Sequence, residues 1–152
     1  MFKRLNREFS RYPGQFWLMF AGMILSTTGA AMIWPFLMIF ACESLSLPLA
    51  AAASLMSINA AAGLFSSIVA GPIVDRAGRK WVMVIGLVGN GLCYFLLSRA
   101  GSYTGFALTL GLSGVFSPLY LVGSDAMLAD LFPAEKQADA YALIRMARNI
   151  GV

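Results

Sequence analysis

The sequence contains no histidine and only two cysteines among its 152 residues. Without an imidazole, the chain lacks the commonest general base, metal ligand and proton relay. Cys42 and Cys93 match no disulfide framework and no zinc-site spacing, so we interpret both as small apolar packing residues. We therefore expect no catalytic residue, no metal and no cofactor in a protein that is not an enzyme.

Charged residues are also scarce, because they make up 12% of the chain, against about 25% in ordinary soluble domains. None occurs in residues 12–42, 44–74, 81–98 or 100–124. About 20 apolar residues of helix cross a hydrocarbon core of about 30 Å, so each of these stretches is long enough, or nearly so, to span a membrane. The composition predicts an all-α, polytopic membrane helix bundle whose partner is the lipid bilayer and not a nucleic acid.

Four transmembrane helices are expected at about residues 14–42, 48–74, 80–98 and 102–130, and the start of a fifth at about 135–152. The first apolar run is longer than the apolar core of a signal peptide, so we interpret it as a transmembrane helix that is not cleaved from the protein. Residues 1–13 would then be a basic tail, and residues 14–152 an incomplete N-terminal transmembrane bundle. We expect the chain to be a piece of a longer protein.

The basic residues predict the orientation of this bundle. Only Arg99 falls on one side of the membrane, and ten fall on the other, in the tail and after the second and fourth spans: Lys3, Arg4, Arg7, Arg11, Arg76, Arg79, Lys80, Lys136, Arg145 and Arg148. Cytoplasmic connections carry an excess of Lys and Arg. We therefore expect a multi-pass protein of the inner or plasma membrane, with its N-terminus in the cytoplasm.

Two rows of small or polar residues at four-residue spacing indicate which helix sides face other helices. The second span carries Asn59, Gly63, Ser67 and Gly71, and the fourth carries Gly105, Thr109, Ser113 and Ser117. Such rows let helix backbones approach closely within a membrane. We predict that both rows are packing faces.

The segment 71–80, GPIVDRAGRK, places four charges between the second and third spans. It is compatible with a solvated turn whose charges set the topology, and also with a built ionic latch. It closely resembles the signature G-x-x-x-D-R-x-G-R-[KR] of the loop between helices 2 and 3 in the major facilitator superfamily, matched at Gly71, Asp75, Arg76, Gly78, Arg79 and Lys80. The segments FWLMFAGMILSTTGAAMIWPFL and SDAMLADLFPAEKQADAYALIRMARNIG are similar to drug-antiporter-like members of that superfamily.

This resemblance implies a secondary transporter of 12 helices, in which two six-helix bundles alternately expose a central cavity to either side. The chain would be part of the N-terminal half, with the missing C-terminal half as its partner. Asp75 would contact a helix end in that half and hold the cytoplasmic side shut. Arg79 would hold Asp75 in place, and Asp125 would pair with Arg79.

A substrate cavity in this bundle would be mostly apolar with scattered hydrogen-bonding groups, at Ser26, Thr27, Trp34, Asn59, Asn90, Ser113 and Tyr120. This suits a small lipophilic molecule better than a sugar phosphate. The resemblance favours efflux, with protons as a candidate coupling ion. The first span holds no acidic or basic residue, which leaves uniport, or coupling through the absent half, open.

Two other classes of membrane protein remain compatible with the sequence. One is a small four-helix transporter that works as an oligomer, although such proteins usually carry an acidic residue in the first span. The other is a non-transporting membrane scaffold, in which the charges of segment 71–80 only set the topology.

Overall fold

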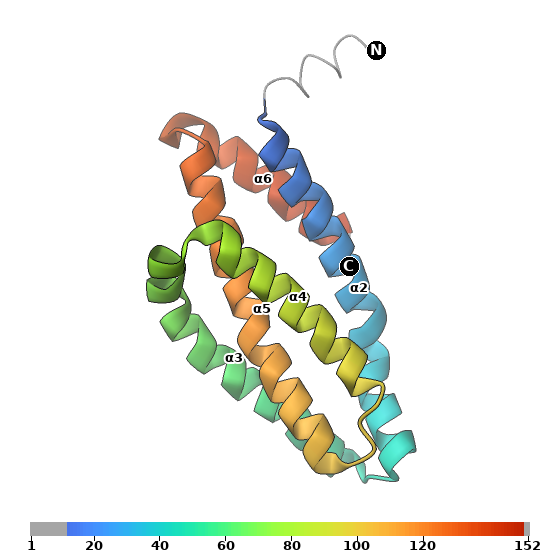
Figure 1. The fold of residues 1–152 in the computed structure, drawn as a ribbon. Helices are drawn as coiled ribbons and strands as arrows, with labels where there is room; N and C mark the ends of the chain where they lie inside the picture. The colour runs from blue at the N-terminus through green and yellow to red at the C-terminus, as the bar shows by residue number, and fades with distance from the viewer. Residues whose placement is uncertain (1–11, 151–152) are drawn as a thin grey trace. The chain divides into compact units, whose positions relative to one another are not determined.

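The computed structural model describes residues 12–150, which form five α-helices (Figure 1). In chain order these are α2 (Gly14–Leu45), α3 (Leu49–Ala77), α4 (Arg79–Leu97), α5 (Tyr103–Leu131) and α6 (Ala134–Ile150). These residues contain no strand, so the predicted all-α class is confirmed. Most of the predicted basic tail, residues 1–11, and the last two residues of the fifth predicted helix, 151–152, lie outside the described range.

Four of these helices are long and apolar enough to cross a membrane, as predicted. The helices α2, α3 and α5 contain 32, 29 and 29 residues, and α4 contains 19. At a rise of about 1.5 Å per residue, α4 is about 28 Å long, close to the hydrocarbon thickness of about 30 Å. The 17-residue α6, which we expected as the start of a fifth span, is not among these four helices over its described length.

The end of α3 differs from the prediction by three residues, because the helix continues to Ala77 and not only to residue 74. Asp75 and Arg76 are compatible with helical backbone, and Arg76 in the last turn complements the negative end of the helix dipole. The helix stops at Gly78, the one described glycine with a positive φ. Segment 71–80 therefore consists of two helix ends joined by a single residue, and not of a longer loop.

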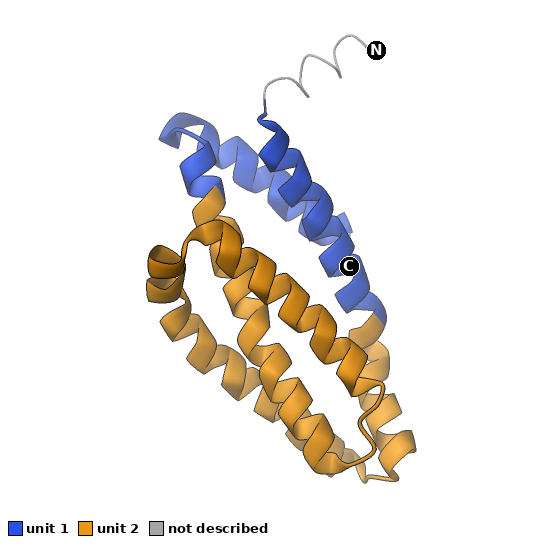
Figure 2. Ribbon diagram, in the orientation of Figure 1, with its two compact units in different colours: residues 1–32, 128–152 blue, residues 33–127 orange. Residues whose placement is uncertain are grey.

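The helices divide into two compact units, coloured separately in Figure 2. Unit 1 comprises residues 1–32 and 128–152, and unit 2 comprises residues 33–127. The described part of unit 1 therefore holds the beginning of α2, the end of α5 and α6. Unit 2 holds the rest of α2, all of α3 and α4, and most of α5.

An aromatic cluster occupies the core of unit 1. Phe16 of α2 is fully buried, and its ring centroid lies 5.5 Å from that of Phe132, which follows α5. Tyr12 packs on both rings. The side chain of Gln137 in α6 donates hydrogen bonds to the carbonyl oxygens of Ala129 and Phe132, at 3.0 and 3.1 Å. These bonds satisfy two acceptors that the end of α5 leaves open.

The core of unit 2 consists of two apolar clusters that both include α5. One joins α2, α3, α4 and α5 through Leu37, Ala41, Ala52, Leu55, Leu97, Phe106 and Leu110. The other joins α3, α4 and α5 through Ala70, Val74, Val82 and Leu119. The helices α3, α4 and α5 contribute to both clusters, and α2 contributes to the first alone.

Two side chains of α3 donate hydrogen bonds to the backbone of α5. The Asn59 amide nitrogen lies 2.8 Å from the carbonyl oxygen of Leu110, and the Ser66 hydroxyl lies 2.6 Å from that of Val115. The two donors are seven residues apart and thus lie on one face of α3, two turns from each other. We call these two bonds the polar clip. They fix α3 against α5 both along and around the helix axis.

Glycines allow the helix backbones of unit 2 to approach closely. A Cβ atom at Gly114 of α5 would overlap the carbonyl oxygen of Asn59 on α3. A Cβ atom at Gly86 of α4 would lie 2.8 Å from the backbone nitrogen of Tyr120 on α5. In a membrane the surrounding lipid is as apolar as the helix surfaces, so the hydrophobic effect does not bring helices together. Close packing of the backbones stabilises helix pairs there instead.

The predicted packing row of α3 is only partly correct. Asn59 and Gly63 face α5, but Ser67 is exposed and bonds to its own helix, and a Cβ atom at Gly71 would meet nothing within 4 Å. A step of four residues turns 40° beyond a full circle, so a strict four-residue row leaves the contact face after two steps. The face continues instead through Ser66 and Ala70, which are both buried.

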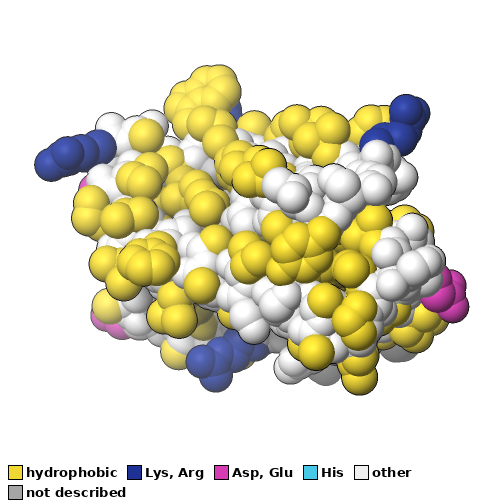
Figure 3. Space-filling view, turned by 90° about the horizontal axis from the view of Figure 1, so that it is seen from below, with side chains coloured by type: hydrophobic (Ala, Val, Ile, Leu, Met, Phe, Trp, Pro, Cys, Tyr) yellow, Lys and Arg dark blue, Asp and Glu magenta, His cyan; other side chains and the backbone are white. Residues whose placement is uncertain are grey.

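Large apolar side chains cover much of the outer surface of the helices. Leu18, Phe65 and Ile68 are exposed by 79, 75 and 71%. In the view of Figure 3, hydrophobic side chains make up most of the coloured surface and charged side chains are few. A surface of this kind is suited to contact with lipid rather than with water.

Candidate functional site

Gly78 forms the whole connection in the α3–α4 corner, the name we give to residues 71–80. Its N–H donates to the carbonyl oxygen of Val74 at 3.1 Å, and its own carbonyl oxygen accepts from the N–H of Val82 at 3.2 Å. Its φ is 87°, a positive value, and its ψ of 131° is extended and not left-handed helical. Side chains disfavour this backbone conformation, so the corner depends on glycine.

We expect Gly78→Ala to lower the free energy of unfolding by about 1–3 kcal/mol, the usual cost of a strained backbone conformation. The effect would come from the backbone alone, because a Cβ atom at Gly78 would meet nothing within 4 Å. Unfolding of the purified chain in detergent micelles with increasing dodecyl sulfate, followed by circular dichroism, measures the change. The control is Gly91→Ala, a helical position that is also open; equal stability of the two variants would contradict the prediction.

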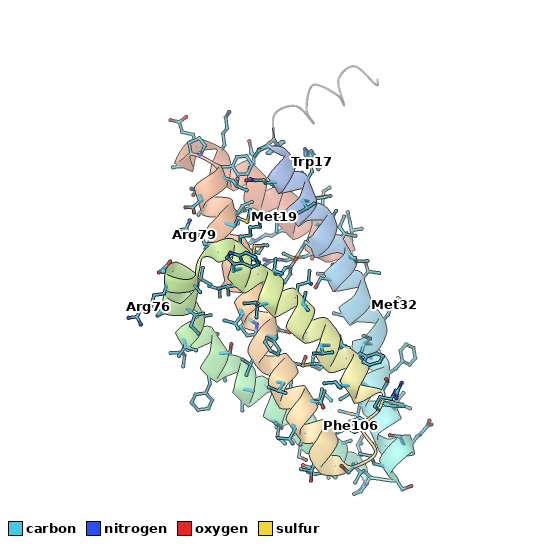
Figure 4. All side chains as sticks on the ribbon, viewed as in Figure 1. Trp17, Met19, Met32, Arg76, Arg79 and Phe106 are labelled. Atoms are coloured by element: carbon cyan, nitrogen blue, oxygen red, sulfur yellow. The ribbon has the colours of Figure 1, made fainter. Side chains whose placement is uncertain are left out.

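Asp75 and Arg76 lie in the last turn of α3, and both are exposed. Figure 4 shows Arg76 pointing away from the helices. A basic residue in a last turn interacts favourably with the helix dipole, whereas a carboxylate there interacts unfavourably with its own helix. The position of Asp75 therefore does not stabilise α3 electrostatically.

Arg79 begins α4 and reaches across to α5. Its guanidinium Nη1 donates a hydrogen bond to the carbonyl oxygen of Ala126 at 3.2 Å. Asp125, the predicted partner of Arg79, is the neighbour of Ala126 in sequence, and both Arg79 and Asp125 are half-buried. The structure thus brings Arg79 to the predicted region of α5, while its ion pair with Asp125 and its support of Asp75 stay predictions.

We expect Arg79→Gln to lower the free energy of unfolding by about 1–2 kcal/mol, because hydrogen bonds from charged donors contribute about 1.5–3 kcal/mol and this one is only half-buried. The measurement is the same unfolding experiment in micelles. Arg76→Gln is the matched control, since Arg76 is exposed, and we expect a change of no more than about 0.5 kcal/mol. The prediction is wrong if the two variants lose the same stability.

The remaining predicted latch residues lie at the two ends of the corner. Lys80 is exposed, and its Nζ lies 5.9 Å from the centre of the Trp81 ring. Gly71 lies one turn before Asp75 in α3, and it makes no close approach to another described helix. The close contact predicted at Gly71 therefore has no counterpart within residues 12–150.

Two of the predicted cavity residues contact each other directly. The Ser113 hydroxyl of α5 donates a hydrogen bond to the side-chain oxygen of Asn90 on α4 at 2.7 Å. Asn59 instead donates to the backbone of α5, and Tyr120 is buried next to Gly86. These contacts bind helices to one another, so the polar groups of unit 2 act at least partly in packing.

The other three predicted cavity residues lie on α2. Trp34 belongs to unit 2 and is 39% exposed. Ser26 and Thr27 belong to unit 1, and the Thr27 hydroxyl donates to the carbonyl oxygen of Met23 within the same helix. Their role in binding a substrate stays a prediction.

Sequence reasoning missed Ser66, Gly86 and Gly114, although each fixes a helix contact. A search at the true helical period of 3.6 residues would have found Ser66, because the spacing from 59 through 63 and 66 to 70 follows that period. Within residues 12–150, no three side chains of the metal-binding types His, Cys, Asp and Glu gather in one group.

The sequence is similar to known transporter sequences over most of its length. A family model described as Major Facilitator Superfamily matches residues 19–152. An uncharacterized MFS-type transporter of Bacillus subtilis, YhjO, is 25% identical over 143 residues, which are 94% of this chain and 36% of the relative.

Two further relatives cover similar parts of the chain. A Na(+), Li(+), K(+)/H(+) antiporter of Planococcus maritimus is 32% identical over 140 residues, or 86% of this chain and 32% of the relative. An uncharacterized MFS-type transporter of Bacillus subtilis, YqjV, is 26% identical over 136 residues, or 90% of this chain and 33% of the relative. The chain spans about a third of the length of the curated relatives it matches.

Proposed function

The chain belongs to the Major Facilitator Superfamily, and from this premise we propose that it is the N-terminal part of a secondary transporter that exports small lipophilic molecules by alternating access. The observation that supports the proposal most directly is the family match, together with four helices long enough to cross a membrane. The chain is thus a multi-pass membrane protein of a transporter family and not an enzyme.

The proposal that the chain is part of a longer transporter rests on its coverage of about a third of its relatives. The DNA beyond codon 152 tests this directly. We expect an open reading frame with roughly seven further spans and a second corner that resembles residues 71–80. A frame without them would favour the small oligomeric four-helix transporter or the non-transporting scaffold.

We propose that the α3–α4 corner is a cytoplasmic latch. The exposed carboxylate of Asp75 would contact a helix N-terminus in the other half of the transporter, where a negative charge is favourable. The single-residue connection at Gly78 and the hydrogen bond from Arg79 to Ala126 would hold that carboxylate in a defined place. Asp125 would complete the latch by pairing with Arg79.

The latch requires the corner to face the cytoplasm, as the distribution of Lys and Arg predicts. Single cysteines at residues 77 and 101, in a chain whose two native cysteines are replaced by serine, test this orientation in intact cells. We expect a membrane-impermeant maleimide to label residue 101 and to label residue 77 only after the cells are opened. Labelling of residue 77 in intact cells would contradict both the orientation and the latch.

We propose a lipophilic substrate because the charge-free stretches of the four spans offer hydroxyl, amide and aromatic groups but no acid or base. The experiment is uptake into everted membrane vesicles that contain the complete transporter, with a panel of lipophilic fluorescent compounds. We expect energy-dependent accumulation of at least one compound, absent from vesicles without the protein. No accumulation of any compound would remove the support for lipophilic export.

A second candidate function is the exchange of alkali cations for protons, and it is favoured by the 32% identity to the Planococcus maritimus antiporter. A cation site would need acidic ligands, and the first acid in the C-terminal part of α5 is Asp125. The same vesicles loaded with a pH-sensitive dye distinguish the two functions. A proton flux triggered by Na⁺, Li⁺ or K⁺, with no uptake of lipophilic compounds, would favour cation exchange.

A further inference from the structure

The helix α4 presents a continuous apolar stripe on its outer side. Trp81, Val88 and Phe95 follow one another at seven-residue spacing and are exposed by 63, 64 and 59%. Val84, Ile85, Leu92 and Leu96 extend the same side and are also exposed. The opposite side is buried in unit 2 through Val82, Gly86, Cys93 and Leu97. The stripe therefore runs along the full length of α4 and is available to lipid chains.

The two ends of this stripe carry different numbers of free cations. Lys80, in the first turn of α4, is exposed, and its ammonium group lies 5.9 Å from the centre of the Trp81 ring. Arg76, in the last turn of α3 just before Gly78, is exposed as well. At the other end of α4, Arg99 is the one basic residue in the connection to α5, residues 98–102, and its guanidinium carbon lies 5.6 Å from the centre of the Phe95 ring. The charges of residues 75–80 sum to +2, from one Asp, two Arg and one Lys.

We propose that Arg76, Lys80 and Trp81 form a binding surface for the headgroup of an anionic phospholipid, whose acyl chain lies along the α4 stripe. The two cations complement the net negative charge that an anionic headgroup has and a zwitterionic headgroup lacks. The amphipathic indole of Trp81 suits the interface, where its N–H can donate to phosphate or ester oxygens. A basic residue near a membrane surface favours anionic lipid by about fivefold. The proposal depends on insertion into a bilayer and not on transport.

Quenching of Trp81 fluorescence by brominated lipids tests the proposal. The protein has three tryptophans, and Trp17→Phe with Trp34→Phe leaves Trp81 as the single reporter. The chain is reconstituted in bilayers with increasing fractions of brominated phosphatidylglycerol or brominated phosphatidylcholine. We expect half-maximal quenching at a severalfold lower fraction of the anionic lipid, and we expect high salt to reduce this preference.

Two variants connect this preference to the named side chains. Arg76→Gln combined with Lys80→Gln is expected to abolish the preference for phosphatidylglycerol, whereas Arg99→Gln, at the other end of the stripe, is expected to retain it. Helical circular dichroism and the quenching curve in brominated phosphatidylcholine report whether each variant folds and inserts normally. A double variant that folds and keeps the full preference would overturn the proposal.

Two further outcomes would also overturn the proposal. Equal quenching by the two lipids in the single-tryptophan protein would show that the cations do not select a headgroup. Competition by millimolar inorganic phosphate would show that the surface binds free phosphate rather than a lipid. Because no transport is measured, a negative result here leaves the proposed transport function intact.

Discussion

Replacement of Asp75 by Asn is expected to lower the export rate of the proposed transporter at least tenfold. The substitution keeps the shape of the side chain and removes only its charge. Asp75 is exposed in the last turn of α3, where its charge is unfavourable for its own helix. If the carboxylate contacts a partly buried helix N-terminus in the other half, the substitution destabilises the state closed to the cytoplasm by about 2 kcal/mol. This changes the equilibrium between the two conformations by a factor of about 30.

Two measurements on the same variant separate the latch from a simple loss of protein. Transport into everted vesicles gives the rate per molecule, and distances between spin labels on the two halves give the populations of the two conformations. The control is Glu135→Gln, which removes an exposed carboxylate at the start of α6 and should change neither quantity. Unchanged transport and unchanged populations for Asp75→Asn would leave the charges of the corner with a topological role alone.

Substitution of Gly114 by Ala is expected to give the largest loss of stability among Gly→Ala substitutions within the helices of unit 2. The new Cβ atom would overlap the carbonyl oxygen of Asn59 and would lie 3.1 Å from the Cβ atom of Ala62. Helical Gly→Ala substitutions otherwise stabilise by about 0.5–1 kcal/mol. Separation of α3 from α5 to relieve the overlap would weaken the polar clip, so we expect a net loss of about 1–3 kcal/mol.

Unfolding in micelles measures this loss, with Gly91→Ala as the matched control. Gly91 is also helical, and a Cβ atom there would meet nothing within 4 Å, so this variant should be as stable as the native chain or slightly more stable. Asn59→Ala and Ser66→Ala extend the test, because each removes one bond of the polar clip. If Gly114→Ala and Gly91→Ala unfold at the same detergent fraction, the two backbones are not held as closely as the structure indicates.

The helices were predictable because a bilayer imposes a simple rule on the sequence. A span must be long and free of charge, so the uncharged stretches predicted four helices. The end of α3 was less predictable, because Asp75 and Arg76 mark the edge of the apolar region while the helix itself continues to Ala77. Charged residues indicate where a span leaves the hydrocarbon core of the bilayer. The helical backbone itself ends where Gly78 adopts its positive φ.

The contacts between helices were predictable only in kind. Gly63 of the second-span row lies close to the α5 backbone, and Ser113 of the fourth-span row bonds to α4. The second-span row then selected Ser67 instead of Ser66, and Thr109 of the fourth-span row bonds within its own helix. The contact at Gly114 depends on the relative rotation and shift of two helices, which no single span encodes. For the candidate site, the resemblance identified the α3–α4 corner as a unit, but it did not indicate that Arg79 donates to the backbone at Ala126.

The connection at Gly78 limits how α3 and α4 can move. One residue separates the two helices, and its N–H and carbonyl oxygen are both engaged in helix hydrogen bonds. Only the φ and ψ of Gly78 connect the two helices, so neither helix can slide along its axis without pulling its neighbour. A displacement of α3 during a functional cycle would therefore displace α4 as well, and the two helices would move together as one rigid pair.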